Sequence, residues 1–169
     1  MTISMYNASI PVFIKSLGNL EAILDKAIAH AAARKIEDSA LTDARLYPDM
    51  FTLTRQIRVA TDMSKGAGAR LAGIEIPRFE DNERTLGDLK ARLHKAIDFL
   101  KTLTAAQIDG TEDKTITLTV GGNTMTFKGL DYLLYWALPN FYFHVTTAYN
   151  LLRHNGIEIG KIDFLGKVQ

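Results

Sequence analysis

The sequence contains no cysteine, which excludes disulfide bonds, thiolate metal ligands and cysteine nucleophiles. It also lacks an excess of charge of one sign, because 20 lysines and arginines are balanced by 19 aspartates and glutamates, giving a net charge of +1. A chain without a strongly basic surface has little electrostatic attraction for nucleic acids or for anionic lipids. We therefore expect neither nucleic acid nor a membrane among its partners.

Targeting segments and linkers are also missing. The first residues, Met1-Thr2-Ile3-Ser4-Met5-Tyr6, do not show the basic region and apolar run of a signal peptide or membrane anchor. No repeat, low-complexity tract or flexible linker divides the 169 residues. The absence of cysteine fits a reducing compartment. The sequence therefore predicts one cytoplasmic domain, residues 1–169, large enough to bury a core without cross-links or structural metals.

Most of the chain shows the apolar spacing of three and four residues that is typical of amphipathic helices. The first predicted helix has its apolar stripe at Ile10, Phe13, Leu17, Leu20, Leu24, Ala27 and Ala31. Pro11 is expected either to bend this helix or to mark its start. After a polar connection from Glu37 to Tyr47, a second helix is predicted to begin near Pro48, with Asp49 favouring its N-terminus. Its buried stripe is expected at Met50, Leu53, Ile57, Ala60, Ser64, Ala67 and Leu71.

A third helix and a hairpin follow. Thr85 and Asp88 form a capping-box pattern ahead of an apolar stripe at Leu86, Leu89, Leu93, Ile97, Leu100 and Leu103. The period then changes from 3.6 to 2 over residues 115–127, and Gly121-Gly122-Asn123 supplies a turn, which predicts a β-hairpin. An isolated hairpin is marginal in water, so the bundle or a second chain must cover its apolar face. This face is expected to consist of Ile116, Leu118, Val120, Met125 and Phe127.

The last helix is predicted to start around residues 129–131 and to be kinked at Pro139, which lacks an amide and clashes with the preceding turn. Gly156 is expected to end it in the left-handed conformation, with Ile157 packing back on the last turn. The predicted fold class is therefore all-α. It is a four-helix bundle with a small β-hairpin inserted between helices 3 and 4.

Polar and aromatic groups on this last helix are the candidate site. Asn140 and His144 are four residues apart, so they share a helical face and can direct a carboxamide and an imidazole into one space. Trp136 and Tyr149 belong to a dense set of aromatic residues that either packs the core or walls a pocket for a small ligand. Three interpretations of His144 are open. It is a buried histidine that bonds to Asn140 or to a tyrosine hydroxyl, or it is a weak metal ligand, or it contacts a ligand or transfers protons.

Three stretches of the chain carry a family resemblance. They are Leu46-Tyr47-Pro48-Asp49-Met50, Leu138-Pro139-Asn140-Phe141-Tyr142-Phe143-His144 and Gly160-Lys161-Ile162-Asp163-Phe164-Leu165. With the order of three helices, a hairpin and a last helix, the chain resembles the DinB/YfiT-like four-helix-bundle superfamily of proposed metalloenzymes, and more closely a branch of uncharacterised bacterial proteins. The resemblance spans nearly the whole chain and is strongest from Leu130 onward.

This resemblance implies three metal-binding histidines, one on the second helix and two spaced four apart on the last. The last pair falls here on Asn140 and His144, and the second-helix position falls near Gln56, so only one imidazole is present. Carboxamides are weak donors for zinc or nickel. We therefore expect a degenerate site with no bound cofactor; if a divalent metal is held at all, His144 is its ligand.

Two classes of function remain open, and the sequence does not decide whether the chain is an enzyme. The first is a non-catalytic or ligand-binding bundle with a polar pocket of Gln56, Asn140 and His144. The second, implied by the resemblance, is a metal-dependent thiol transferase or isomerase, in which zinc or nickel bound to His144 activates a small thiol. An interaction module is a third possibility. We also predict a homodimer, because the hairpin and the aromatic last helix offer more apolar surface than a bundle of this size leaves exposed.

Overall fold

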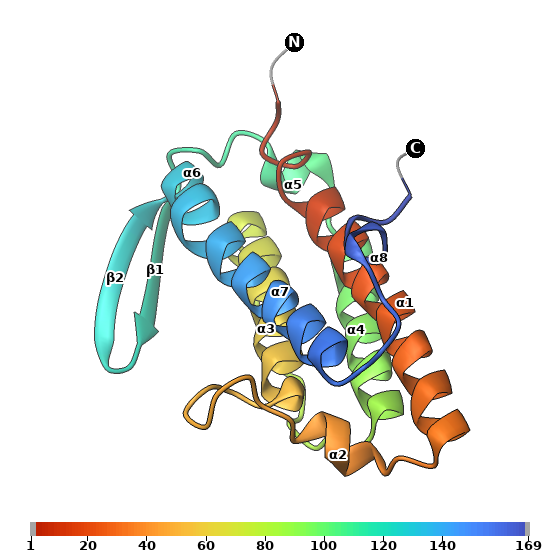
Figure 1. Cartoon of the computed structure of the whole chain (residues 1–169). Helices are drawn as coiled ribbons and strands as arrows, with labels where there is room; N and C mark the ends of the chain where they lie inside the picture. Colours follow the sequence, from red (N-terminus) through yellow and green to blue (C-terminus); the bar gives the residue numbers. More distant parts are fainter. Residues whose placement is uncertain (1–2, 168–169) are drawn as a thin grey trace.

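The computed structural model describes residues 3–167. Its body is built from four long helices, namely α1 (Ile10–Arg34), α3 (Leu53–Ala72), α4 (Leu86–Lys101) and α7 (Leu138–His154). Helix α1 packs along α4, α3 packs along both α4 and α7, and α7 closes the ring against α1, while a two-stranded hairpin projects from one side (Figure 1). This arrangement confirms the predicted all-α four-helix bundle with a hairpin inserted before its last long helix.

Helix α1 begins at Ile10, so Pro11 lies in its first turn. Proline fits there because an amide at this position has no partner within the helix. The hydroxyl of buried Ser9 donates to the Met5 carbonyl at 2.6 Å and fixes the approach to the helix. Of the two roles predicted for Pro11, the structure therefore selects the helix start. The whole predicted apolar stripe of this helix is buried.

The prediction that the second long helix begins near Pro48 is wrong. Helix α3 begins at Leu53, after Thr52, whose hydroxyl accepts a hydrogen bond at 3.3 Å from the amide three residues further on. Pro48, Asp49 and Met50 all precede the helix, so Asp49 does not lie at its N-terminus. A threonine cap satisfies one of the free amides of the first turn, which the proline cannot do. This capping interaction explains the later start.

The polar connection predicted after the first helix contains a short helix, α2 (Asp38–Thr42). Leu41 on α2 is buried in the core. The Asp38 carboxylate accepts a hydrogen bond from the Leu86 amide at 2.8 Å and so links α2 to the first turn of α4. Five residues make little more than one helical turn, which is too short for apolar periodicity to reveal. The connection is therefore more ordered than the sequence indicated.

The capping box predicted at the start of α4 is confirmed. The Thr85 hydroxyl accepts from the Asp88 amide at 3.0 Å, and the Asp88 carboxylate accepts from the Thr85 amide at 2.9 Å. Hydrogen bonds from the backbone amides of Arg84 and Thr85 hold the pKa of Asp88 below its ordinary value. The predicted apolar stripe is buried along its length, and a short helix, α5 (Ala105–Ile108), follows α4.

The predicted hairpin is confirmed as β1 (Thr115–Val120) and β2 (Asn123–Lys128), paired antiparallel. Ile116 and Leu118 are buried, and their cross-strand partners on β2 are partly buried against the same core. Val120, next to the turn, is 45% exposed. The bundle therefore covers the base of the apolar hairpin face and leaves its tip open.

Gly121 and Gly122 form the turn of the hairpin with φ values of 57° and 83°, which confirms the predicted positive φ. The substitution Gly122→Val is expected to destabilise the hairpin by about 1 to 2 kcal/mol, because a β-branched residue strongly disfavours positive φ. Amide hydrogen exchange over residues 116–127 should become faster. Gly18→Ala in α1 is the control, since an added Cβ there meets no atom within 4 Å, and it should slightly stabilise the protein. Unchanged exchange in the Gly122→Val hairpin would contradict the turn assignment.

The last helix is a continuous rod made of α6 (Gly129–Asp131), η1 (Tyr132–Ala137) and α7 (Figure 1). Segment η1 is a π-helix, in which each carbonyl accepts from the amide five residues later. Pro139 is the second residue of α7 and has no amide, so an α-helix would leave the Tyr135 carbonyl without its partner. In the π-helical register the Leu138 amide donates to the Leu133 carbonyl, five residues earlier. The irregularity that the structure shows is this π-helical segment before Pro139, while the kink at Pro139 stays a prediction.

The predicted end of the last helix is confirmed. Gly156 has a φ of 87°, and the amide of the fully buried Ile157 donates to the Leu152 carbonyl at 3.1 Å. The chain then turns back, and α8 (Lys161–Leu165) packs against α1. Within residues 3–167, every helix falls short of the length and apolar character needed to span a membrane.

Candidate functional site

Helices α3 and α7 bring Gln56 and His144 together. Both side chains are buried, with 1% of Gln56 and 8% of His144 exposed. The Gln56 Oε1 atom lies 2.7 Å from His144 Nδ1. Two of the predicted site residues therefore form a direct hydrogen bond. The partner of His144 is Gln56, whereas the sequence pointed to Asn140 or a tyrosine hydroxyl.

A second contact orients the Gln56 carboxamide and so fixes the tautomer of His144. The Gln56 Nε2 atom donates to the Phe51 carbonyl at 3.4 Å, which directs Oε1 at the imidazole. A carboxamide oxygen only accepts, so His144 Nδ1 carries the proton and Nε2 holds the free lone pair. No residue in the described chain bonds to Nε2, and no fully buried side-chain nitrogen or oxygen there lacks a partner, so Nε2 keeps at least a small contact with solvent.

Aromatic rings flank the imidazole of His144. The Phe51 ring lies parallel to it with centroids 6.3 Å apart, and the Phe143 ring lies edge-on at 5.2 Å. The Arg55 guanidinium covers Phe51, with its carbon 3.7 Å from the ring centroid. Burial lowers the pKa of His144, so the imidazole is neutral at neutral pH. The site therefore presents one neutral hydrogen-bond acceptor with aromatic surface on two sides.

Asn140 has a different role from the one predicted from its spacing. Its Nδ2 atom donates to the Trp136 carbonyl at 2.7 Å, within the same helical rod. This carbonyl lies in the π-helical segment, where the hydrogen-bond register changes from the usual pattern. The amide group of Asn140 therefore supports the irregular backbone. It is not the group that holds His144.

The structure does not bring Trp136 and Tyr149 into the Gln56 and His144 pair. The Trp136 ring packs 5.9 Å from Phe127 of the hairpin, and the Tyr149 ring packs edge-on 5.7 Å from Phe164 of α8. Trp136 precedes His144 by about 12 Å along the helix axis, and Tyr149 is about 140° around the helix from it. Both aromatic residues therefore join the helical rod to its neighbouring elements.

The residues at the implied ligand positions do not fit a zinc or nickel ion. Such ions take imidazole, carboxylate or thiolate donors, whereas this site offers one imidazole and two carboxamides. The Gln56 oxygen already accepts from His144, and the Asn140 amide group already binds a carbonyl. Over the described part of the chain, no three histidine, aspartate or glutamate side chains are grouped so that they could hold a metal.

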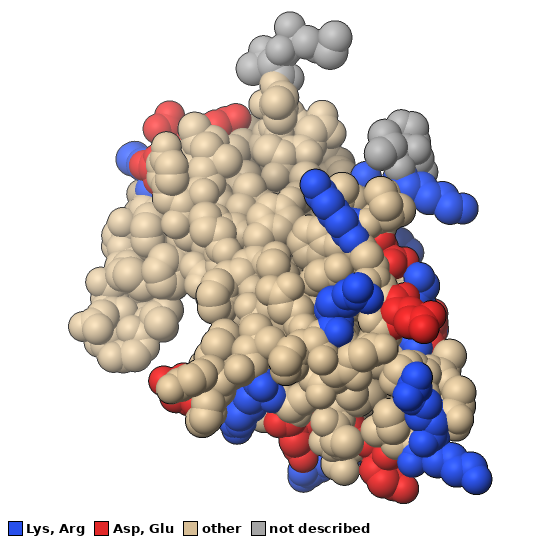
Figure 2. Space-filling view, viewed as in Figure 1, with Lys and Arg blue, Asp and Glu red and all other residues tan. Residues whose placement is uncertain are grey.

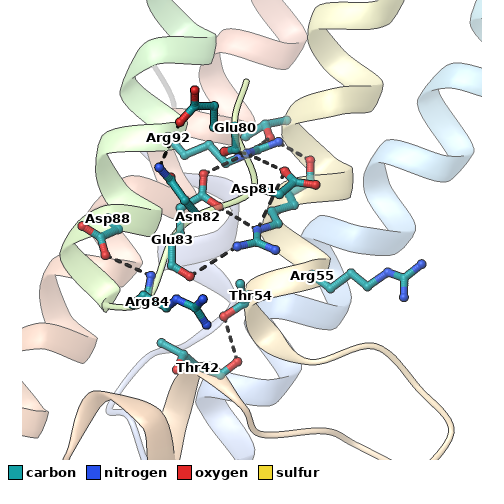
Figure 3. A network of polar contacts seen from close by, with 12 residues as sticks. Thr42, Thr54, Arg55, Glu80, Asp81, Asn82, Glu83, Arg84, Asp88 and Arg92 are labelled. Carbon is teal, nitrogen blue, oxygen red and sulfur yellow. Dashed lines mark hydrogen bonds and ion pairs between the residues drawn. The ribbon is translucent and has the colours of Figure 1, made fainter. Parts of the chain in front are cut away.

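An ionic network with no signal in the sequence fixes the loop between α3 and α4, and its Arg92 and Glu83 are buried while its Asp62 and Asp81 are partly exposed (Figure 3). At its centre is Arg92 of α4, with 2% of its side chain exposed. Its guanidinium lies 2.8 Å from Glu83 and 3.0 Å from both Asp81 and Asp62. Arg58 of α3 pairs with Glu83 at 2.6 Å. We call this set the loop network, and it joins two helices through the loop that connects them.

The charges of the loop network stabilise one another. Burial alone would raise the pKa of Glu83, but hydrogen bonds from Arg92 and Arg58 hold it below its ordinary value. Burial would lower the pKa of Arg92, but the bond to Glu83 raises it. A hollow of about 510 Å³ opens beside the network around Phe79. Of the charged groups that line it, Arg92 and Glu83 are paired with each other, and Arg55 points away from the network in Figure 3. The loop network therefore has a structural role, which is to hold the loop against α3 and α4.

Comparison with known proteins shows which family has this sequence and fold. The family described as "Domain of unknown function (DUF1993)" matches residues 5–165, from just before α1 to the end of α8. The chain belongs to the DUF1993 family. This DUF1993 protein is similar to a crystal structure of a DinB family member protein from Shewanella denitrificans, with 38% sequence identity and a TM-score of 0.86. The match covers 96% of this chain and 92% of that chain.

The similarity to a DinB family member confirms the resemblance that the sequence indicated. It extends over the four long helices, the hairpin and α8, since nearly the whole of both chains is matched. A comparison with proteins of curated function gave no match.

Proposed function

We propose that this DUF1993 protein binds a small organic molecule beside His144 without a metal and without catalysis. The observation that carries the proposal is the 2.7 Å hydrogen bond between Gln56 Oε1 and His144 Nδ1. In the related metal-binding bundles implied by the resemblance, both positions would hold a metal. Here one side chain binds the other, so the pair satisfies itself and leaves a single free group, Nε2.

The chemistry of the free Nε2 atom limits the class of ligand. A neutral imidazole nitrogen with a lone pair accepts a hydrogen bond, so the ligand must supply a donor such as a hydroxyl, amine or thiol. The Phe51 and Phe143 rings beside the imidazole favour an apolar or aromatic body on the same ligand. A buried imidazole is also costly to protonate, which disfavours an anionic carboxylate as its partner.

Phenol and anisole test this proposal, because the two probes have similar shapes but only phenol has a donor. Phenol is expected to shift the nuclear magnetic resonances of the His144 imidazole and the Phe51 and Phe143 rings in a saturable way, with millimolar affinity as is usual for a fragment of this size. Anisole should bind at least about tenfold more weakly, since the imidazole lone pair would lose its donor.

The variant His144→Ala is the protein control for this titration. It should remove the preference for phenol over anisole while the fold, measured by circular dichroism, is retained. Equal binding of both probes to the parent, or a preference for phenol that survives in His144→Ala, would show that Nε2 does not select the ligand.

A further inference from the structure

One face of this protein is almost without charge. The chain has no Asp, Glu, Lys or Arg between Asp131 and Arg153, nor between Lys114 and Lys128. These two stretches are the last helical rod, from η1 into α7, and the hairpin. In Figure 2, viewed as in Figure 1, the surface over the hairpin and the adjoining rod is a broad area without blue or red side chains. We call this area the uncharged face.

Large apolar side chains are exposed on the uncharged face. Tyr135 is 73% exposed and Phe143 is 56% exposed. On the helical rod and the hairpin tip, the other apolar side chains exposed by about two fifths are Leu130, Leu134, Tyr142 and Val120. Residues 135, 139, 143, 146 and 150 recur at helical spacing and are all exposed on the outer side of the rod. The row begins with the apolar Tyr135, Pro139 and Phe143 and ends with the uncharged polar Thr146 and Asn150. Exposed apolar side chains gathered in this way mark interaction sites.

We propose that the uncharged face is the docking surface for a second copy of this chain. Burying a charge without a partner is costly, so the complement of this face must itself be free of charge over a similar area. On the rest of the face shown in Figure 2, lysines and arginines are interspersed with aspartates and glutamates. A second copy provides a matching uncharged face in a two-fold arrangement, in which the same patch meets itself.

The size of the uncharged face agrees with this partner. A specific interface buries about 800 Å² on each partner, which is roughly a tenth of the 9468 Å² accessible surface of this chain. With about 200 Å² for a whole aromatic side chain, the exposed parts of Tyr135, Tyr142 and Phe143 alone contribute about 300 Å². The exposed parts of Leu134 and Val120 add to this area, and so can the hairpin threonine pairs Thr117–Thr126 and Thr119–Thr124.

The hairpin supports the same conclusion independently. Its sheet has only the strands β1 and β2, so each strand has one unpaired edge. Natural proteins commonly protect such edges with charged side chains or proline. This hairpin has neither between Lys114 and Lys128. An edge that is long, uncharged and close to an exposed apolar helix face is one that a second chain covers.

The test compares two aspartate substitutions at equally exposed apolar positions. Tyr135 on the uncharged face is 73% exposed, and Ile162 on α8 is 74% exposed. By light scattering at micromolar concentration, the parent and Ile162→Asp should have twice the 18.8 kDa mass of the chain. Tyr135→Asp should raise the dimer dissociation constant about 30-fold or more, as expected when a central interface residue is lost.

Phe143→Asp provides a second variant on the uncharged face, and circular dichroism checks that each variant is folded. A parent that stays monomeric up to millimolar concentration would overturn the proposal and leave a different protein as the partner. Dimers that persist in both Tyr135→Asp and Phe143→Asp, or that dissociate equally in Ile162→Asp, would also overturn it. Tyr135→Asp separates self-association from the phenol titration, because it leaves in place the Phe143 ring that lies beside the His144 imidazole.

Discussion

Replacing Arg92 with methionine is expected to lower the free energy of unfolding by about 3 to 5 kcal/mol, the cost that is usual when one partner of a buried ion pair is removed. Methionine keeps much of the side-chain volume but removes the charge. The Glu83 carboxylate, with 8% of its side chain exposed, would then lose its 2.8 Å partner and keep only Arg58 at 2.6 Å, and the more exposed Asp62 and Asp81 would lose their contacts with Arg92. Urea denaturation followed by circular dichroism measures the change.

Two further variants separate the loop network from a general effect of lost charge. Lys90, like Arg92, is on α4, and Lys90→Met removes its ion pair with Asp25 of α1. That pair is largely exposed and should contribute little to the stability. Glu83→Gln added to Arg92→Met should lower the stability further, because Arg58, 2.6 Å from Glu83, would lose its carboxylate partner. If Arg92→Met costs no more than Lys90→Met, the loop network is not what holds the loop to the helices.

The parts of the fold that were predicted correctly are those that local physics decides. The apolar stripes of α1 and α4 follow from a 3.6-residue period, and the hairpin follows from a period of two with two glycines at its turn. The start of α3 was misplaced because Pro48 and Thr52 are competing local signals four residues apart. Thr52 prevails since its hydroxyl caps a free amide, a contact that depends on the backbone geometry before the helix.

The loop network shows why longer-range features could not be predicted. The run Arg78-Phe79-Glu80-Asp81-Asn82-Glu83-Arg84 reads as a polar loop, because a charged stretch between helices is usually solvated. Arg92 sits on the margin of an apolar stripe and has no sequence signal that separates it from an exposed arginine. Only the packing of α3 beside α4 brings Asp62, on the far side of the loop, within 3.0 Å of it.

The candidate site was predicted in part. The resemblance placed Gln56 opposite His144, and the two side chains do meet. The role of Asn140 depends on a π-helical segment. A search for 3.6-residue periodicity cannot detect such a segment, because it takes the whole helix to be α-helical. Trp136 and Tyr149 were grouped with the site only by aromatic density, and density on one helix does not distinguish its faces.

Restoring two histidines is expected to create a metal site that the parent lacks. Gln56→His combined with Asn140→His would place three imidazoles where the parent has one imidazole and two carboxamides. Gln56 lies within 2.7 Å of His144, and residues 140 and 144 have the one-turn spacing that suits paired metal ligands. The double variant should bind zinc or nickel at least about 100-fold more tightly than the parent, measured by calorimetric titration after chelator-free purification.

The single variant His144→Ala decides between this outcome and the metal-dependent alternative. If the parent site is degenerate, the purified parent carries no stoichiometric metal, and His144→Ala costs about 1 to 3 kcal/mol of stability through a lost hydrogen bond and a small cavity. Near-stoichiometric zinc or nickel in the parent, lost in His144→Ala, would instead favour a thiol transferase or isomerase that uses His144 as a ligand. A folded double variant that binds no metal would show that residues 56, 140 and 144 do not converge on one point, because three imidazoles at convergent positions suffice to hold a divalent ion.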